Sequence, residues 1–94
     1  MVKANDLIKE QQEREEKKKE TYKKILNRIE KKIVLASKSN FYECKYDIPE
    51  FIIGLPIYSV DNCKKFIKEK LKKNGFKVTN FLNNIILISW YPSN

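Results

Sequence analysis

The chain contains no histidine, the side chain on which much general acid–base chemistry near neutral pH depends. Neither of its two glycines, Gly54 and Gly75, lies in a phosphate-cradling loop motif. Cys44 and Cys63 lack a histidine that could activate a thiol, and two cysteines cannot complete a four-ligand zinc site within one chain. The carboxylates are dispersed or fall on predicted helix surfaces. We therefore predict no enzymatic activity, no cofactor, no metal ion and no small-molecule substrate.

Long apolar runs are also missing. The run Ile85–Ile88 is far too short to span a bilayer, and the N-terminus lacks the apolar stretch of a secretory signal. These features predict a protein that is neither membrane-bound nor secreted. In that setting the two cysteines are expected to be reduced, with a Cys44–Cys63 disulfide as the alternative.

Arginine is scarce: Arg14 and Arg28 are the only two, although the formal net charge is +8. A basic chain commonly binds an anionic partner. Lysine, however, is less suited than arginine to form paired hydrogen bonds with base edges and phosphate groups. The chain is also rich in lysine, asparagine and isoleucine, whose codons are rich in A and T. The lysine excess therefore has two explanations at this stage, a polyanion-binding surface or genome composition.

The N-terminal third predicts one long helix from Asn5 to about Lys38, with Asn5 or Asp6 as its N-cap. Its first half is polar, with oppositely charged pairs four residues apart that stabilise an exposed helix. Its second half carries one apolar stripe, which we expect to dock on the domain, a coiled coil being the alternative. The stripe comprises Tyr22, Ile25, Leu26, Ile29, Ile33 and Ala36. We divide the chain into a charged helical extension, residues 1–20, and a single small domain, residues 21–94.

The remaining segments alternate between strands and one further helix. Residues 41–48 alternate in polarity and predict a half-buried strand, and residues 51–55, between Pro49 and Pro56, predict a buried connection with at most one helical turn. The second helix is expected to begin after Ser59 as N-cap and to end at Asn74–Gly75 in a Schellman motif. Residues 76–82 and 85–91 then predict a hairpin with a two-residue turn at Asn83–Asn84.

Because residues 85–88 are apolar on both faces, the last strand is predicted to be central in its sheet. The predicted fold class is thus α+β: a long N-terminal helix on a small three-stranded antiparallel sheet with one packed helix. The order helix–strand–helix–strand–strand is winged-helix-like, an analogy at the level of element order.

Two surfaces are candidates for binding. A two-residue turn would place Phe81, Ile86, Ile88 and Trp90 together on one face of the hairpin, where an exposed apolar patch would bind a protein partner unless the first helix covers it. The second helix would direct a set of lysines away from its apolar stripe, toward nucleic-acid phosphates or toward solvent. That set comprises Lys64, Lys65, Lys68, Lys72 and Lys73.

The chain resembles a family of short proteins encoded by nucleocytoplasmic large DNA viruses, the giant viruses. The resemblance is carried in order by residues 21–26, Ile48–Phe51, Gly54–Pro56 with Tyr58, Cys63, Leu71, Asn74–Phe76 and Ile88–Trp90. It implies a viral origin, an A/T-rich genome, and a location in the virion or the infected-cell cytoplasm, including the virus factory. The resemblance identifies no functional residue in this chain.

The leading hypothesis is a non-enzymatic viral interaction protein, virion-associated or an assembly factor, that binds another viral protein or itself. The alternative is a sequence-nonspecific nucleic-acid-binding module. Salt discriminates between them, since phosphate contacts weaken steeply as ionic strength rises.

Overall fold

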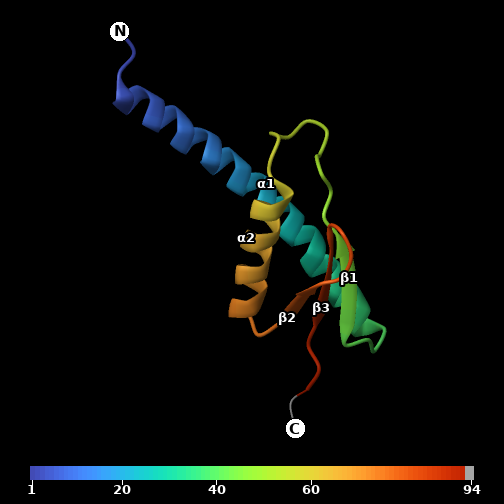
Figure 1. Cartoon of the computed structure of the whole chain (residues 1–94). Coiled ribbons are helices and arrows are strands. Elements are labelled where there is room, and N and C mark those ends of the chain that lie inside the picture. Colours follow the sequence, from blue (N-terminus) through green and yellow to red (C-terminus); the bar gives the residue numbers. More distant parts are fainter. Residues whose placement is uncertain (93–94) are drawn as a thin grey trace.

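A 35-residue helix, α1 (Ala4–Lys38), is the largest element of the computed structural model, which describes residues 1–92 (Figure 1). At 1.5 Å per residue the helix is about 52 Å long, and the molecule measures 62 Å along its longest axis. Ser93 and Asn94, which end the predicted domain 21–94, lie outside the described residues. Lys3, rather than the predicted Asn5 or Asp6, occupies the N-cap, while Asp6 lies in the first turn, where the helix dipole favours an acid.

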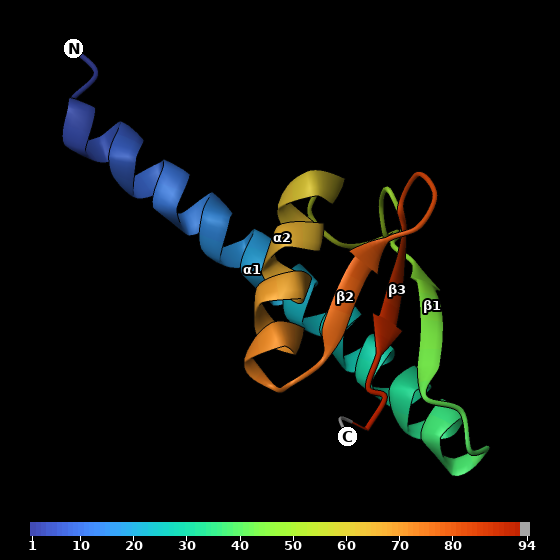
Figure 2. The same cartoon turned by 60° about the horizontal axis from the view of Figure 1, so that its bottom comes forward.

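The two halves of α1 have different environments. The first buried side chain is Thr21, and from there the predicted apolar stripe packs against the sheet and the second helix. Residues 4–20 project beyond the domain, away from the sheet (Figures 1 and 2). The expectation that the stripe docks on the domain is confirmed.

The sheet is antiparallel and contains β1 (Glu43–Asp47), β2 (Lys77–Asn80) and β3 (Ile85–Ser89) in the order β1-β3-β2. The predicted central position of the last strand is confirmed (Figure 2). Cys44, Val78, Ile86 and Ile88 face the helices and are buried. The α+β fold class and the element order α-β-α-β-β agree with the prediction.

The second helix, α2 (Val60–Lys73), has the predicted ends. The Ser59 hydroxyl accepts a hydrogen bond from the Asn62 amide at 3.4 Å, and Cys63, Ile67 and Leu71 are buried. At the C-terminus, Phe76 donates to the Leu71 carbonyl and Gly75, at φ +89°, donates to Lys72, which is the Schellman pattern. α1 ends in the same way, with Asn40 at φ +66° and the Phe41 amide donating to Ala36.

Candidate interaction surfaces

The face predicted from the hairpin is not an exposed patch, and this prediction is wrong. Ile86 and Ile88 are 0% exposed beneath the helices, and Trp90 is half-buried against Phe76, ring centroids 5.9 Å apart. Of the four predicted residues only Phe81 is substantially exposed. The first helix and α2 cover the face on which the other three lie.

The error came from the hairpin register. The Phe81 amide donates to the Ile85 carbonyl at 2.9 Å, so the loop contains Leu82, Asn83 and Asn84 rather than two residues. Val78 therefore lies opposite Ile88, whereas a two-residue turn would pair Val78 with Ser89. A slip of one residue moves every side chain of a strand to the other face relative to its neighbour.

The β1–α2 connection carries the most exposed apolar side chains of the domain, contrary to the predicted buried connection. Phe51, Ile53 and Ile57 are 66%, 91% and 83% exposed. The segment contains a turn closed by Leu55 N–H and the Ile52 carbonyl at 3.1 Å, and no helix. We call Phe51, Ile53 and Ile57 the apolar loop tip.

The base of this connection is held on the domain. The Tyr58 hydroxyl donates to the Pro49 carbonyl, joining the two ends of the connection. The Tyr58 ring packs edge-to-face on Tyr22 of α1 with centroids 5.8 Å apart. The apolar loop tip is thus presented from an anchored base. The only sequence signal for it was five apolar residues in 51–57 with no helix or strand periodicity.

The lysines predicted on α2 lie together on its outer side. Lys65, Lys72 and Lys73 are exposed, and Lys64 and Lys68 are half-buried. The Lys64 ammonium donates to the Asn83 carbonyl at 2.7 Å, which holds the hairpin loop beside the first turns of α2. Residues 59–77 contain seven lysines and two carboxylates. We call this region the α2 lysine face.

Basic charge is concentrated in the domain, and no ion pair neutralises it among residues 21–92. Residues 1–20 hold six cations and six carboxylates, so the whole net charge of +8 belongs to residues 21–94. Within residues 1–92, the ion pairs are Arg14–Glu10 and Lys18–Glu15, both on the projecting half of α1. Apart from Lys64, which donates to the Asn83 carbonyl, the lysines predicted on α2 make no ion pair among these residues and remain available to an external anion.

The family of unknown function DUF5759 matches residues 2–72 of the chain, from the start of α1 to near the end of α2. The chain belongs to this family. A curated relative, an uncharacterised protein of Acanthamoeba polyphaga mimivirus, is 33% identical over 90 residues, which cover 92% of this chain and 73% of the relative. The resemblance to giant-virus proteins is thereby confirmed. No solved structure matches the chain.

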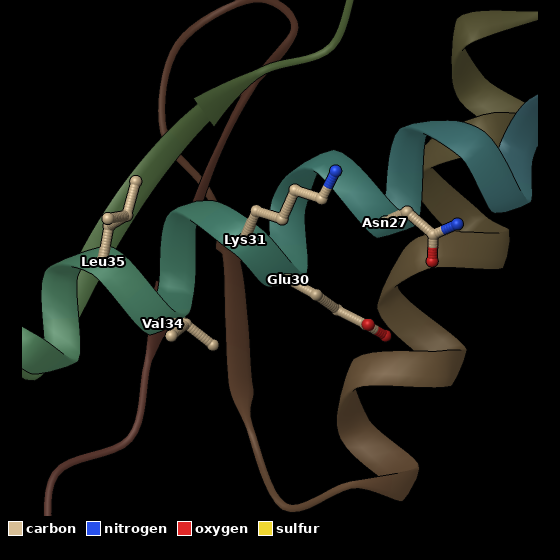
Figure 3. A pocket seen from close by; sticks show the side chains of 5 residues that line it. All are labelled: Asn27, Glu30, Lys31, Val34 and Leu35. Atoms are coloured by element: carbon tan, nitrogen blue, oxygen red, sulfur yellow. The ribbon is translucent and has the colours of Figure 1, made fainter.

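In this DUF5759 member, one surface hollow is a strip of the outer side of α1 (Figure 3). Asn27, Glu30, Lys31, Val34 and Leu35 line it, and all five project from a single helix. Because all its lining residues come from α1, the hollow is an open groove rather than an enclosed cavity. Between residues 1 and 92, no cluster of three or more His, Cys, Asp or Glu side chains could hold a metal ion.

Both thiols are free and buried. Burial raises the pKa of Cys63 to about 11 and also raises that of Cys44. A thiol with a pKa this high is protonated near neutral pH and is a poor nucleophile. Within the described residues, no helix is both long and apolar enough to cross a membrane.

Proposed function

We propose that this protein is a non-enzymatic viral interaction module, virion-associated or acting in assembly, that docks a protein partner on the apolar loop tip. The observation that carries the proposal is the exposure of Phe51, Ile53 and Ile57, three large apolar side chains on one anchored connection. Apolar side chains gathered at an exposed site are a usual mark of protein–protein contact. The protein would be located in the virion or in the infected-cell cytoplasm.

The proposal is tested by photo-crosslinking in infected cells. A photoreactive phenylalanine at Ile53 is expected to give discrete adducts with a defined protein partner, identified by mass spectrometry. The matched control carries the same group at Leu35, which is also exposed and apolar but lies near the C-terminal end of α1. If the probe at Ile53 gives no adduct, or if the probes at Ile53 and Leu35 give the same adducts, docking on the loop tip is refuted.

A second candidate function, sequence-nonspecific nucleic-acid binding, is favoured by the α2 lysine face, which makes no ion pair among residues 1–92. Lysines that contact phosphates release counterions, so the logarithm of the affinity should fall linearly with the logarithm of salt concentration. The absence of arginine on this face fits contact with phosphates rather than with base edges.

Fluorescence anisotropy with a labelled DNA duplex across a salt series tests this candidate. Replacement of Lys64, Lys65, Lys68 and Lys72 by glutamine should abolish binding. The control replaces Lys17, Lys24, Lys31 and Lys38, four exposed lysines spaced seven residues apart on α1, and changes the net charge equally. Equal losses in the two variants would show that overall charge, not the α2 lysine face, is responsible.

A further inference from the structure

The outer edge of β1 carries backbone groups without partners. At the two ends of this strand the Trp90 amide donates to the Tyr42 carbonyl at 2.9 Å, and the Ile48 amide donates to the Asn84 carbonyl at 3.0 Å. Because hydrogen-bonded pairs alternate in an antiparallel ladder, the even-numbered residues of β1 bond to β3 and the odd-numbered residues direct their N–H and C=O groups outward. Within residues 1–92 these outward groups have no backbone partner; they belong to Glu43, Lys45 and Asp47.

β1 lacks the features that usually protect a sheet edge. Residues 43–47 contain no proline, and their pairing with β3 is continuous. The Lys45 ammonium lies over the Phe81 ring, 3.9 Å from its centroid, so this side chain crosses the sheet and turns away from the edge. The opposite edge, β2, directs only Val78 and Asn80 outward. β1 is therefore the edge to which a further strand could add most extensively.

The last turns of α1 lie beside this edge. They pack on the inner face of β1 and extend past it (Figures 1 and 2). A surface groove runs between the two elements, and the residues that line it include Lys32, Leu35, Ala36, Phe41 and Cys44. Leu35 and Phe41 are 65% and 62% exposed. A strand added at this edge would thus find hydrogen-bonding groups along β1 and apolar side chains on α1.

The side of α1 that faces β1 is also basic. At 100° per residue Arg28 and Lys32 lie about 40° apart, whereas Glu30, the only carboxylate in residues 21–42, lies about 160° from Lys32. The Lys32 ammonium is 5.8 Å from the Tyr46 ring centroid. Burial raises the pKa of Tyr46, and the neighbouring Arg28 guanidinium opposes this rise. Neither cation forms an ion pair among residues 1–92, so an incoming carboxylate beside Tyr46 would meet both.

We infer that β1 binds an extended segment of a partner protein, which adds antiparallel as a fourth strand and carries an acid followed two residues later by an apolar residue. Antiparallel addition continues the pairing of the sheet and is slightly more stable per residue than parallel addition. The acid, opposite Tyr46, would meet Lys32 and Arg28. The apolar side chain, opposite Cys44, would pack on Ala36. Backbone hydrogen bonds would supply affinity, and these two side chains would supply specificity.

A second copy of β1 does not have this chemistry. The side chains that β1 directs toward α1 include no carboxylate. Antiparallel pairing of two copies about Lys45 would also place Lys45 opposite Lys45 and Glu43 opposite Asp47, and like charges directly opposite each other destabilise a sheet. The charges beside the edge therefore favour a different chain with an acidic and apolar segment.

This inference goes beyond the proposed function, because the apolar loop tip takes no part in it. The two remain distinguishable by photo-crosslinking. A segment bound at β1 would react with the probe at Leu35 through its own residues, which mass spectrometry separates from the residues that react at Ile53. Failure of either binding surface leaves the other standing.

Titration of the isotope-labelled full chain with the peptide acetyl-Thr-Asp-Thr-Val-Thr-amide, followed by nuclear magnetic resonance, tests the inference. We expect saturable changes in the amide signals of Glu43, Lys45 and Asp47. The signals of Val78 and Asn80 at the other edge should stay unchanged. Absence of saturable changes at millimolar peptide would overturn the inference. So would the same changes on raising the protein concentration without peptide, since a second copy would then be the occupant.

Methylation of single peptide amides distinguishes strand addition from contact through side chains alone. In the antiparallel register the threonine amides of the peptide point to β1, whereas its aspartate and valine amides point away. Methylation of the central threonine amide should weaken binding at least about tenfold, and methylation of the valine amide less than about twofold. Equal effects of the two methyl groups would refute the register.

Charge reversal tests the acidic position. Lys32→Glu should weaken binding of the peptide at least about tenfold and should restore binding of a peptide with lysine in place of aspartate. The matched control, Lys31→Glu, changes the net charge equally at an exposed position about 100° away around α1, and should change the affinity less than about twofold. Equal losses in the two variants, or no binding of the lysine peptide to Lys32→Glu, would overturn the inference.

Discussion

Tyr22 and Tyr58 meet edge to face with ring centroids 5.8 Å apart, and this contact joins the long helix α1 to the β1–α2 connection. Their hydroxyl groups differ. Tyr58 donates to the Pro49 carbonyl, whereas the buried Tyr22 hydroxyl has no hydrogen-bond partner among the described residues. The two neighbouring tyrosines therefore differ in one respect: the Tyr58 hydroxyl makes a hydrogen bond, and the Tyr22 hydroxyl makes none among the described residues.

Removing each hydroxyl should therefore have opposite consequences. We expect Tyr58→Phe to lower the free energy of unfolding by about 1 kcal/mol, the usual net value of a hydrogen bond. Tyr22→Phe should be neutral or stabilising, because it removes a buried polar group that lacks a partner. Urea denaturation of both variants measures the difference, and equal effects would contradict this assignment.

The Schellman motif after α2 requires a left-handed residue at Gly75, where φ is +89°. Gly75→Val should lower the free energy of unfolding by more than about 1 kcal/mol, since a β-branched side chain is strained at positive φ. At the end of α1 the same position is held by Asn40 at φ +66°, so Asn40→Gly should be neutral to mildly stabilising. Thermal unfolding measures both, and a harmless Gly75→Val would refute the requirement.

Alkaline pH should destabilise the fold. Burial raises the pKa of Cys63 from 9.0 to about 11; burial, followed by the Cys63 charge, raises that of Tyr58 from 10.0 to about 12. Above about pH 9 the unfolded chain binds fewer protons than the folded one. The stability that these two groups contribute is therefore fully present below their pKa values in the unfolded chain. It is lost as the pH rises through their pKa values in the folded chain.

Urea denaturation between pH 7.5 and 11 measures this loss, with a slope of at most about 1.4 kcal/mol per pH unit for each group. Cys63→Val should flatten the part of the slope between pH 9 and 11, whatever its effect on absolute stability. A free energy of unfolding that stays constant from pH 8.5 to 10.5 would contradict the burial of these groups.

Two apolar residues of the hairpin should respond differently to truncation. Ile88 is fully buried beneath the helices, so Ile88→Ala should cost about 2–5 kcal/mol of stability. Phe81 is 47% exposed and lies under the Lys45 ammonium, 3.9 Å from the ring centroid, so Phe81→Ala should cost about 1 kcal/mol or less. Guanidinium denaturation measures both, and similar losses would contradict the observed register.

The projecting half of α1 should be dispensable for folding. Deletion of residues 1–16 keeps Lys17, whose carbonyl accepts a hydrogen bond from the Thr21 hydroxyl at 3.4 Å, and should change the free energy of unfolding by less than about 0.5 kcal/mol. Deletion of residues 1–24 also removes the buried Tyr22 and should unfold much of the domain. Circular dichroism of dilute samples distinguishes the two outcomes.

Much of the architecture was readable from local signals. Ser59 before an apolar stripe and Asn74–Gly75 after it delimit α2 because capping depends on residues within one turn of the helix end. The four apolar residues 85–88 identified a central strand, since a strand covered on both faces has no polar side. The stripe from Tyr22 to Ala36 identified the half of α1 that docks.

Local sequence signals did not predict which candidate surfaces are exposed. The face shared by Val78 and Ile88 depends on whether the hairpin loop has two or three residues, and Asn83–Asn84 is compatible with either. Phe51 and Ile53 are as apolar as the core residues, and residues 51–55 were predicted to be a buried connection. Whether they are covered depends on the room left by α1, α2 and the sheet.

The sequence by itself determined the order of the elements of this protein, the two ends of α2, the central strand and the concentration of positive charge in residues 21–94, because each follows from neighbouring residues or from counting. Only the tertiary structure decided the hairpin register, the burial of Ile86 and Ile88 and the exposure of the apolar loop tip. Those outcomes depend on how separate segments compete to cover the same apolar surface, and no single segment specifies the result.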